Sequence, residues 1–77
     1  MAANMIKLSD TEVERVLRHS TSKEYFKHGN WTTDVNEADR FNDVIEVAQT
    51  CTRYGLKDVE LTLQSRHGCE VFSTPIR

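Results

Sequence analysis

The stretch that most constrains the fold runs from residue 29 to residue 41 and reads Gly-Asn-Trp-Thr-Thr-Asp-Val-Asn-Glu-Ala-Asp-Arg-Phe. It contains the only tryptophan of the chain and leads directly into the longest helical pattern. Thr33 or Asp34 can cap a short helix just beyond the tryptophan. We therefore expect Trp31 and Phe41 to lie near each other, on either side of that helical turn.

A longer helix is predicted after this stretch, and signals specify both of its ends. Asp43, followed three residues later by Glu46, resembles a capping box. Gly55 suits the left-handed position just past the helix, and Leu56 can then fold back on the last turn, as in a Schellman ending. The predicted apolar stripe of this helix consists of Val44, Ile45, Ala48, Cys51 and Tyr54.

Strand patterns lie on both sides of this helix. The aromatic run at residues 24–27 and the segment 31–33 favour strands, and Gly29 between them predicts a hairpin. After the helix, apolar and polar residues alternate from Val59 to Gln64, as in a strand with one dry face and one wet face. The dry face consists of Val59, Leu61 and Leu63, and the wet face of Glu60, Thr62 and Gln64.

A second hairpin is predicted to close the chain. The turn is assigned to His67-Gly68, and a two-residue loop places Phe72 opposite Leu63 and Val71 opposite Gln64. A three-residue loop would exchange Val71 and Phe72. Pro75 lacks an amide hydrogen, so the last strand should end near Thr74.

The N-terminal pattern predicts a first helix. Ser9 and Glu12 match a capping box, and Val13, Val16 and Leu17 form a narrow apolar stripe that ends before residues 19–22. The order is therefore α-β-β-α-β-β. We predict one α+β domain over residues 1–77, with residues 1–4 disordered and an antiparallel sheet of about four strands carrying both helices on one face.

Composition limits the classes of function. The net charge is −2, and the excess of acidic residues falls in the middle of the chain, at residues 29–60. No apolar run approaches the ~18 residues that a membrane-spanning helix needs, and the N-terminus lacks the features of a signal peptide. We expect a cytoplasmic protein with no membrane partner, in which Cys51 and Cys69 are free thiols.

The segment from residue 24 to residue 54 resembles a loose pattern found in small, mostly uncharacterised bacterial and phage proteins. It is carried by Tyr25-Phe26, by Trp31-Thr32 with Asp34, Ala38 and Phe41, and by the helix that follows. The resemblance implies an α+β fold and assigns no catalytic residue. The rest of the chain matches no family pattern.

Neither catalysis nor metal binding has a recognisable motif. The histidines and cysteines lack the close paired spacing of zinc ligands. A calcium loop starting at Asp34 fails, because Asp39 stands where glycine is required and Ile45 where the bidentate glutamate belongs. No nucleophile elbow or glycine-rich phosphate loop occurs. We therefore predict a protein that is not an enzyme and that uses no metal or cofactor.

Two binding hypotheses remain. In the first, the chain is an accessory or regulatory module that binds a protein partner through an acidic surface or an edge strand, and an edge strand would also allow a dimer. An origin in a phage or other mobile element fits such a module. The alternative is that the acidic side chains simply form a solvated surface. The predicted binding residues are Asp34, Glu37, Asp39, Asp43, Glu46, Glu60, Thr62 and Gln64.

In the second hypothesis, a basic patch beside Tyr25 and Trp31 contacts nucleic acid by phosphate pairing and base stacking. Acidic residues interrupt this patch in the sequence. Trp31 would also stabilise the fold more if it were buried in the core than if it were exposed for stacking. The net negative charge also argues against tight nonspecific binding to a phosphate backbone. The residues of this alternative are Arg15, Arg18, Lys23, Lys27 and His28.

Overall fold

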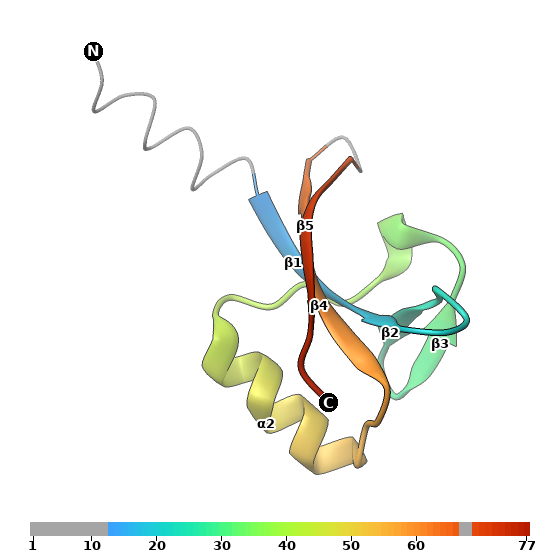
Figure 1. Cartoon of the computed structure of the whole chain (residues 1–77), viewed down its shortest axis with the longest axis vertical. Helices are drawn as coiled ribbons and strands as arrows, with labels where there is room; N and C mark the ends of the chain where they lie inside the picture. The colour runs from blue at the N-terminus through green and yellow to red at the C-terminus, as the bar shows by residue number, and fades with distance from the viewer. Residues whose placement is uncertain (1–12, 67–68) are drawn as a thin grey trace.

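A computed structural model of the chain describes residues 13–66 and 69–77. Within them, five strands form one antiparallel sheet in the order β3-β2-β1-β4-β5 (Figure 1). A 3-10 helix and an α-helix lie between the third and fourth strands. The elements are β1 (Val13–His19), β2 (Tyr25–Lys27), β3 (Asn30–Thr32), η1 (Val35–Glu37), α2 (Val44–Tyr54), β4 (Val59–Ser65) and β5 (Glu70–Pro75).

The predicted α+β fold, with two helices over a four-stranded sheet, is wrong, because the segment after residue 12 is a strand. β1 pairs with β4 over its whole length, from Val13↔Ser65 to His19↔Val59. This long ladder and the fit of β-branched valines to a pleated surface outweigh the local helical spacing. The described part of the chain is mostly β, with one α-helix. The capping box at Ser9 and the expected disorder of residues 1–4 lie outside the described residues.

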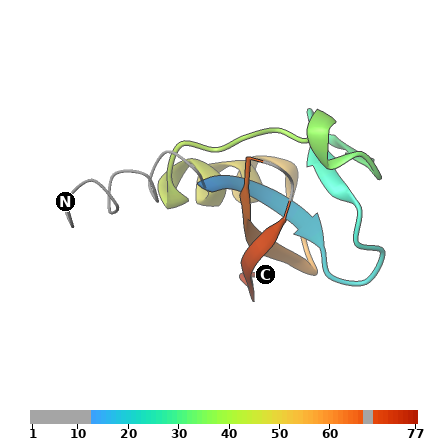
Figure 2. The same ribbon diagram turned by 90° about the horizontal axis from the view of Figure 1, so that it is seen from above.

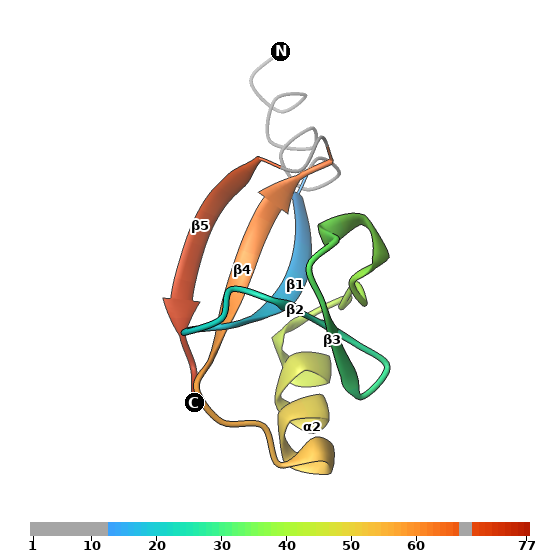
Figure 3. The same cartoon turned by 90° about the vertical axis from the view of Figure 1, so that its right-hand side faces the viewer.

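β1 is the central strand, and its side chains are buried on both faces of the sheet. Val16 and Leu17 are both 0% exposed, although successive residues of a strand point to opposite faces. α2 packs on the face of Leu17, as Figures 2 and 3 show from two directions. The core on this face consists of Leu17, Phe26, Phe41, Val47, Cys51 and Val59.

The ends of α2 are as predicted, but its buried stripe is not. Asp43 Oδ1 accepts a hydrogen bond from the Glu46 amide at 2.9 Å, and Gly55 has φ +59°. The Leu56 amide then donates to the carbonyl of Cys51 at 3.0 Å. The apolar residues at the start of the predicted stripe are exposed, Val44 by 59% and Ile45 by 65%. Val47 and Cys51 are the buried residues of α2.

The predicted first hairpin is confirmed. β2 and β3 pair with Phe26 opposite Trp31, and the two turn residues His28 and Gly29 both have positive φ, as a tight hairpin turn requires. Trp31 is half-buried and packs against the core cluster that contains Phe41. Its ring meets those of Phe26 and His19 edge-on, at centroid distances of 5.8 and 5.4 Å. Trp31 therefore anchors the hairpin to the core.

The predicted wet face of β4 is buried. Glu60, Thr62 and Gln64 are 8%, 1% and 2% exposed. β4 lies between β1 and β5, and side chains of these two strands, Arg18 and Ser73, contact Glu60 and Thr62 on this face. The pairing of Leu63 with Phe72 is confirmed. Gln64 faces Glu70 instead of Val71, since a β-bulge interrupts the register at this point.

Candidate binding groove

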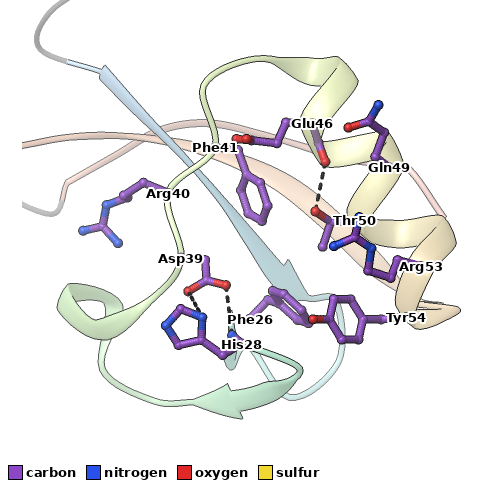
Figure 4. A pocket seen from close by; sticks show the side chains of 10 residues that line it. All are labelled: Phe26, His28, Asp39, Arg40, Phe41, Glu46, Gln49, Thr50, Arg53 and Tyr54. Atoms are coloured by element: carbon purple, nitrogen blue, oxygen red, sulfur yellow. Dashed lines mark hydrogen bonds and ion pairs between the residues drawn. The ribbon is translucent and has the colours of Figure 1, made fainter.

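A groove of about 540 Å³ lies between one side of α2 and the segment that joins η1 to that helix (Figure 4). The turn of the β2–β3 hairpin closes one end of it. We call this site the α2 groove. Its lining consists of Phe26, His28, Asp39, Arg40, Phe41, Glu46, Gln49, Thr50, Arg53 and Tyr54.

Aromatic rings form the apolar part of the α2 groove. Phe26 and Phe41 line the groove but belong to the buried core, at 2% and 8% exposed. Tyr54 packs against Phe26 at a centroid distance of 5.2 Å and lies over the backbone of Gly29. A Cβ atom at Gly29 would lie 3.2 Å from Cε1 of Tyr54, so the glycine allows the end of α2 to approach the hairpin.

The wall opposite α2 is held in place by a contact between Asp39 and His28. The Asp39 carboxylate accepts from the His28 amide at 2.9 Å, and its other oxygen lies 3.2 Å from Nδ1 of the same residue. The Asp39 amide donates to the carbonyl of Phe26 at 3.0 Å. These contacts fix the linker segment to the hairpin turn and satisfy the carboxylate locally.

Arg40 extends the same wall, and its guanidinium is already paired. Nε donates to Glu14 at 2.9 Å, while Nη1 donates to the carbonyls of Val35 and Ala38 at 2.8 and 2.7 Å. Arg40 therefore ties η1 to β1, and its charge is already offset by Glu14.

The α2 wall carries groups that are less fully used. Glu46 accepts from the Asn42 amide through Oε1 at 2.8 Å, and the hydroxyl of Thr50 donates to the Glu46 carbonyl. The guanidinium of Arg53 points into the groove in Figure 4. Among residues 13–66 and 69–77, no hydrogen bond or ion pair is recorded for the side chains of Arg53, Gln49 or Tyr54. The groove thus presents donors that a ligand can use.

The predicted acidic residues are engaged mainly in local structure. Asp34 and Asp43 accept backbone amides at the starts of η1 and α2. Glu37 lies 3.4 Å from Nζ of Lys27 and 3.3 Å from the Thr32 hydroxyl. The residues of this set that line the groove are Asp39 and Glu46. The members of this set on β4, namely Glu60, Thr62 and Gln64, are buried.

The predicted basic residues do not form one patch. Arg15 and Arg18 are three positions apart on β1, so they project from opposite faces of the sheet. Arg15 donates to the carbonyl of Asn42 at 2.9 Å. Lys23 and Lys27 lie near Glu60 and Glu37, which offset their charges, and His28 lies 3.2 Å from Asp39. Tyr25 is paired with Arg18 in the sheet register.

Arg18 is instead the centre of a polar network on the sheet face away from α2. Its guanidinium donates to Glu60 at 2.6 Å, to Glu70 at 2.9 Å and to the Ser73 hydroxyl at 3.3 Å. Ser73 shares a further hydrogen bond with Thr62. The network links β1, β4 and β5, and it explains how polar side chains are tolerated inside this sheet.

The charges of this network shift the pKa of Glu60. Burial of the carboxyl opposes ionisation and acts to raise the pKa. The hydrogen bond from Arg18, together with the positive charges of Arg18 and Lys23, outweighs burial, so the pKa of Glu60 lies below its ordinary value. Glu60 is therefore held as a carboxylate at neutral pH.

Most residues of the α2 groove carry no functional motif in the sequence. Gln49, Thr50 and Arg53 belong to no candidate site, and the sequence pattern places Tyr54 in the core stripe of the helix. The available signal was their spacing, since residues 46, 49, 50 and 53 recur at intervals of three and four and so share one side of a helix. The opposite wall comes from the linker and hairpin turn, and no local pattern indicates that these segments face α2.

Two further properties concern the described ranges, 13–66 and 69–77. They contain no group of three or more histidine, cysteine or acidic side chains placed to hold a metal ion. They also contain no helix that is long and apolar enough to cross a bilayer.

Comparisons with known protein families, with curated proteins and with solved structures found no match for this chain. The resemblance over residues 24–54 stays a prediction.

Proposed function

We propose that this chain is a non-enzymatic accessory or regulatory module of the bacterial or phage cytoplasm, and that it receives a short segment of a partner protein in the α2 groove. The observation that carries this proposal is an open groove with an aromatic floor and several side-chain donors on its α2 wall. The lining is more polar than apolar, so the groove suits a segment that makes hydrogen bonds to α2 and packs part of its length on the aromatic rings.

The polar groups of the groove favour binding over covalent chemistry. His28 and Asp39 resemble a base and its orienting carboxylate, at 3.2 Å. Thr50 is the only serine or threonine among the described residues that line the groove, and so the only candidate hydroxyl nucleophile of that kind there. Its hydroxyl donates to the Glu46 carbonyl within α2 and not to His28. Nucleophilic catalysis needs a hydrogen bond between nucleophile and base. The geometry therefore supports recognition as the role of the groove.

A nucleic-acid interface receives less support. Four of its five predicted cations lie near a carboxylate, and the fifth donates to a backbone carbonyl. Pairing lowers the positive potential that attracts a phosphate backbone. The half-buried Trp31, packed on Phe26, is likewise occupied in the core.

Selection from a displayed library of linear peptides, with the immobilised protein as target, tests the proposal. Thr50→Trp would fill the groove from the α2 wall, and Gln49→Trp is a second blocking variant at an exposed position of the same wall. Ala48→Trp introduces the same residue on the other side of α2, outside the groove, and serves as the matched control.

We expect wild type and Ala48→Trp to enrich the same peptides and the blocking variants to lose them. Thermal melts of each variant establish that it is folded. Enrichment of the same peptides by folded blocking variants, or no enrichment by wild type, would contradict a protein-binding role for the groove.

A further inference from the structure

Resting on the proposed function, we infer that the α2 groove selects a partner segment that carries a carboxylate, and that the guanidinium of Arg53 receives it. The recognised group is the side chain of an aspartate or glutamate.

The acidic and basic side chains of the lining other than Arg53 already have partners within the described residues. The Asp39 carboxylate holds His28, and the Arg40 guanidinium holds Glu14. Glu46 accepts a backbone amide at the start of α2, where the helix dipole favours a negative charge. Among residues 13–66 and 69–77, no carboxylate lies within ion-pair distance of the Arg53 guanidinium. A ligand carboxylate would supply the missing partner.

The surroundings of Arg53 suit a carboxylate held in a defined orientation. Its planar guanidinium can donate two parallel hydrogen bonds to both oxygens of a carboxylate. In Figure 4 it lies between Thr50 and Tyr54 and points toward the aromatic floor. The Tyr54 hydroxyl can add a third donor. Apolar groups of the same segment would pack on the ring of Tyr54, which is 48% exposed, and exclude water from the ion pair, which strengthens it relative to an exposed pair.

The groove is polar along its length, and this polarity places the carboxylate at one end. Glu46 precedes Arg53 by two turns of α2, a rise of about 10 Å on the same side of the helix. The Glu46 end therefore repels an acidic side chain and the Arg53 end attracts it. The C-terminal dipole of α2 opposes this attraction with about half an elementary charge, which is less than the full charge of Arg53.

Peptides from the library selection provide the probes for this inference. Each groove-dependent peptide is synthesised with its acidic residue and with the corresponding amide, Glu to Gln or Asp to Asn. Both forms are titrated against wild type, Arg53→Gln, Arg53→Lys and Lys57→Gln. Lys57 is an exposed cation just past α2 that does not line the groove, so Lys57→Gln controls for a change in net charge.

We expect the amide form to bind wild type about tenfold or more weakly than the acid, which corresponds to about 1.4 kcal/mol. Arg53→Gln should bind both forms equally, Arg53→Lys should restore part of the preference, and Lys57→Gln should keep all of it. Groove-dependent peptides that show no preference for the acid would overturn the inference and leave the proposed function intact. Failure to obtain any groove-dependent peptide would contradict both.

Discussion

At the scale of single residues, charged side chains of this small domain serve the fold as well as its surface. Arg18 joins three strands through Glu60, Glu70 and Ser73, and its side chain is only 13% exposed. A buried cation of this kind is tolerated because its donors meet carboxylates and a hydroxyl. Arg53 differs, since it points into a groove and no partner is recorded for it in the part of the chain that the structure describes.

The lowered pKa of Glu60 predicts a loss of stability in acid. A carboxyl whose pKa is lower in the folded than in the unfolded state stabilises the fold above its unfolded pKa of about 4.3. This contribution is lost as the pH falls through the lower, folded value. Glu60→Gln should therefore reduce the free energy of unfolding at pH 7 by roughly 2 kcal/mol, and the difference from wild type should shrink toward pH 3.

Urea unfolding of wild type and Glu60→Gln at a series of pH values measures this effect. Glu14→Gln removes a more exposed carboxylate that pairs with Arg40, and it provides a control with a smaller expected effect. A difference between wild type and Glu60→Gln that stays constant with pH would argue against an ionised Glu60 in the network.

Gly29 and Gly55, which both have positive φ, should respond differently to alanine. Gly29 has φ +86°, and its added methyl would press on the ring of Tyr54, whereas Gly55 has φ +59° with no atom within 4 Å of the added Cβ. Gly55→Ala should cost about 1 kcal/mol for backbone strain alone. Gly29→Ala should cost more and should displace the end of α2 from the hairpin. Chemical denaturation of both variants measures the costs, and equal losses would show that the approach of Tyr54 to Gly29 is unimportant.

At the scale of elements, the sequence specified the parts whose signals are local. Asp43, Glu46 and Gly55 fix the ends of α2, and His28-Gly29 fixes the first hairpin. The helical spacing of Val16 and Leu17 was misleading, because their strand is determined by pairing with β4, more than forty residues away in the chain. The burial of Glu60 was likewise hidden, since it depends on Arg18 from β1 and on the cover that β5 provides.

The β2–β3 hairpin should depend on Trp31 for its attachment to the core. Trp31→Ala removes the edge contacts with Phe26 and His19, and we expect a loss of about 3 kcal/mol in the free energy of unfolding. Trp31→Phe keeps an aromatic edge at this position and should lose less. Thermal melts compare the two, and a Trp31→Ala variant as stable as wild type would place the tryptophan outside the core.

At the scale of the whole molecule, the α2 groove exists because three segments between residues 26 and 54 fold against one another. The hairpin turn, the linker after η1 and one side of α2 each contribute a wall. The sequence indicated these elements separately, and the groove follows only from how the sheet carries the hairpin toward α2. The sequence predicted Asp39 and Glu46 as binding residues because they lie in its acidic middle part. It did not indicate Arg53 and Tyr54, because their role depends on how the hairpin and linker lie against α2.

The molecule also has an apolar surface on the other side of α2, formed by Val44, Ala48 and Ile76 with the adjoining core. Phe72 on β5 is a further exposed apolar side chain. Beside this surface, the outer edge of β5 is interrupted by the bulge near Val71 and by Pro75, two features that discourage strand addition. The predicted edge-strand dimer stays a prediction. This surface is the alternative location for a protein contact.

A titration of the 15N-labelled protein with a selected acidic peptide tests the central claim most directly, because amide chemical shifts report which side of α2 is contacted. We expect the largest changes at Phe41, Thr50, Arg53 and Tyr54, with little change at Val44, Phe72 and Ile76. Large changes on the Val44, Phe72 and Ile76 side, with the residues of the α2 groove unaffected, would contradict the claim that this groove is the binding site.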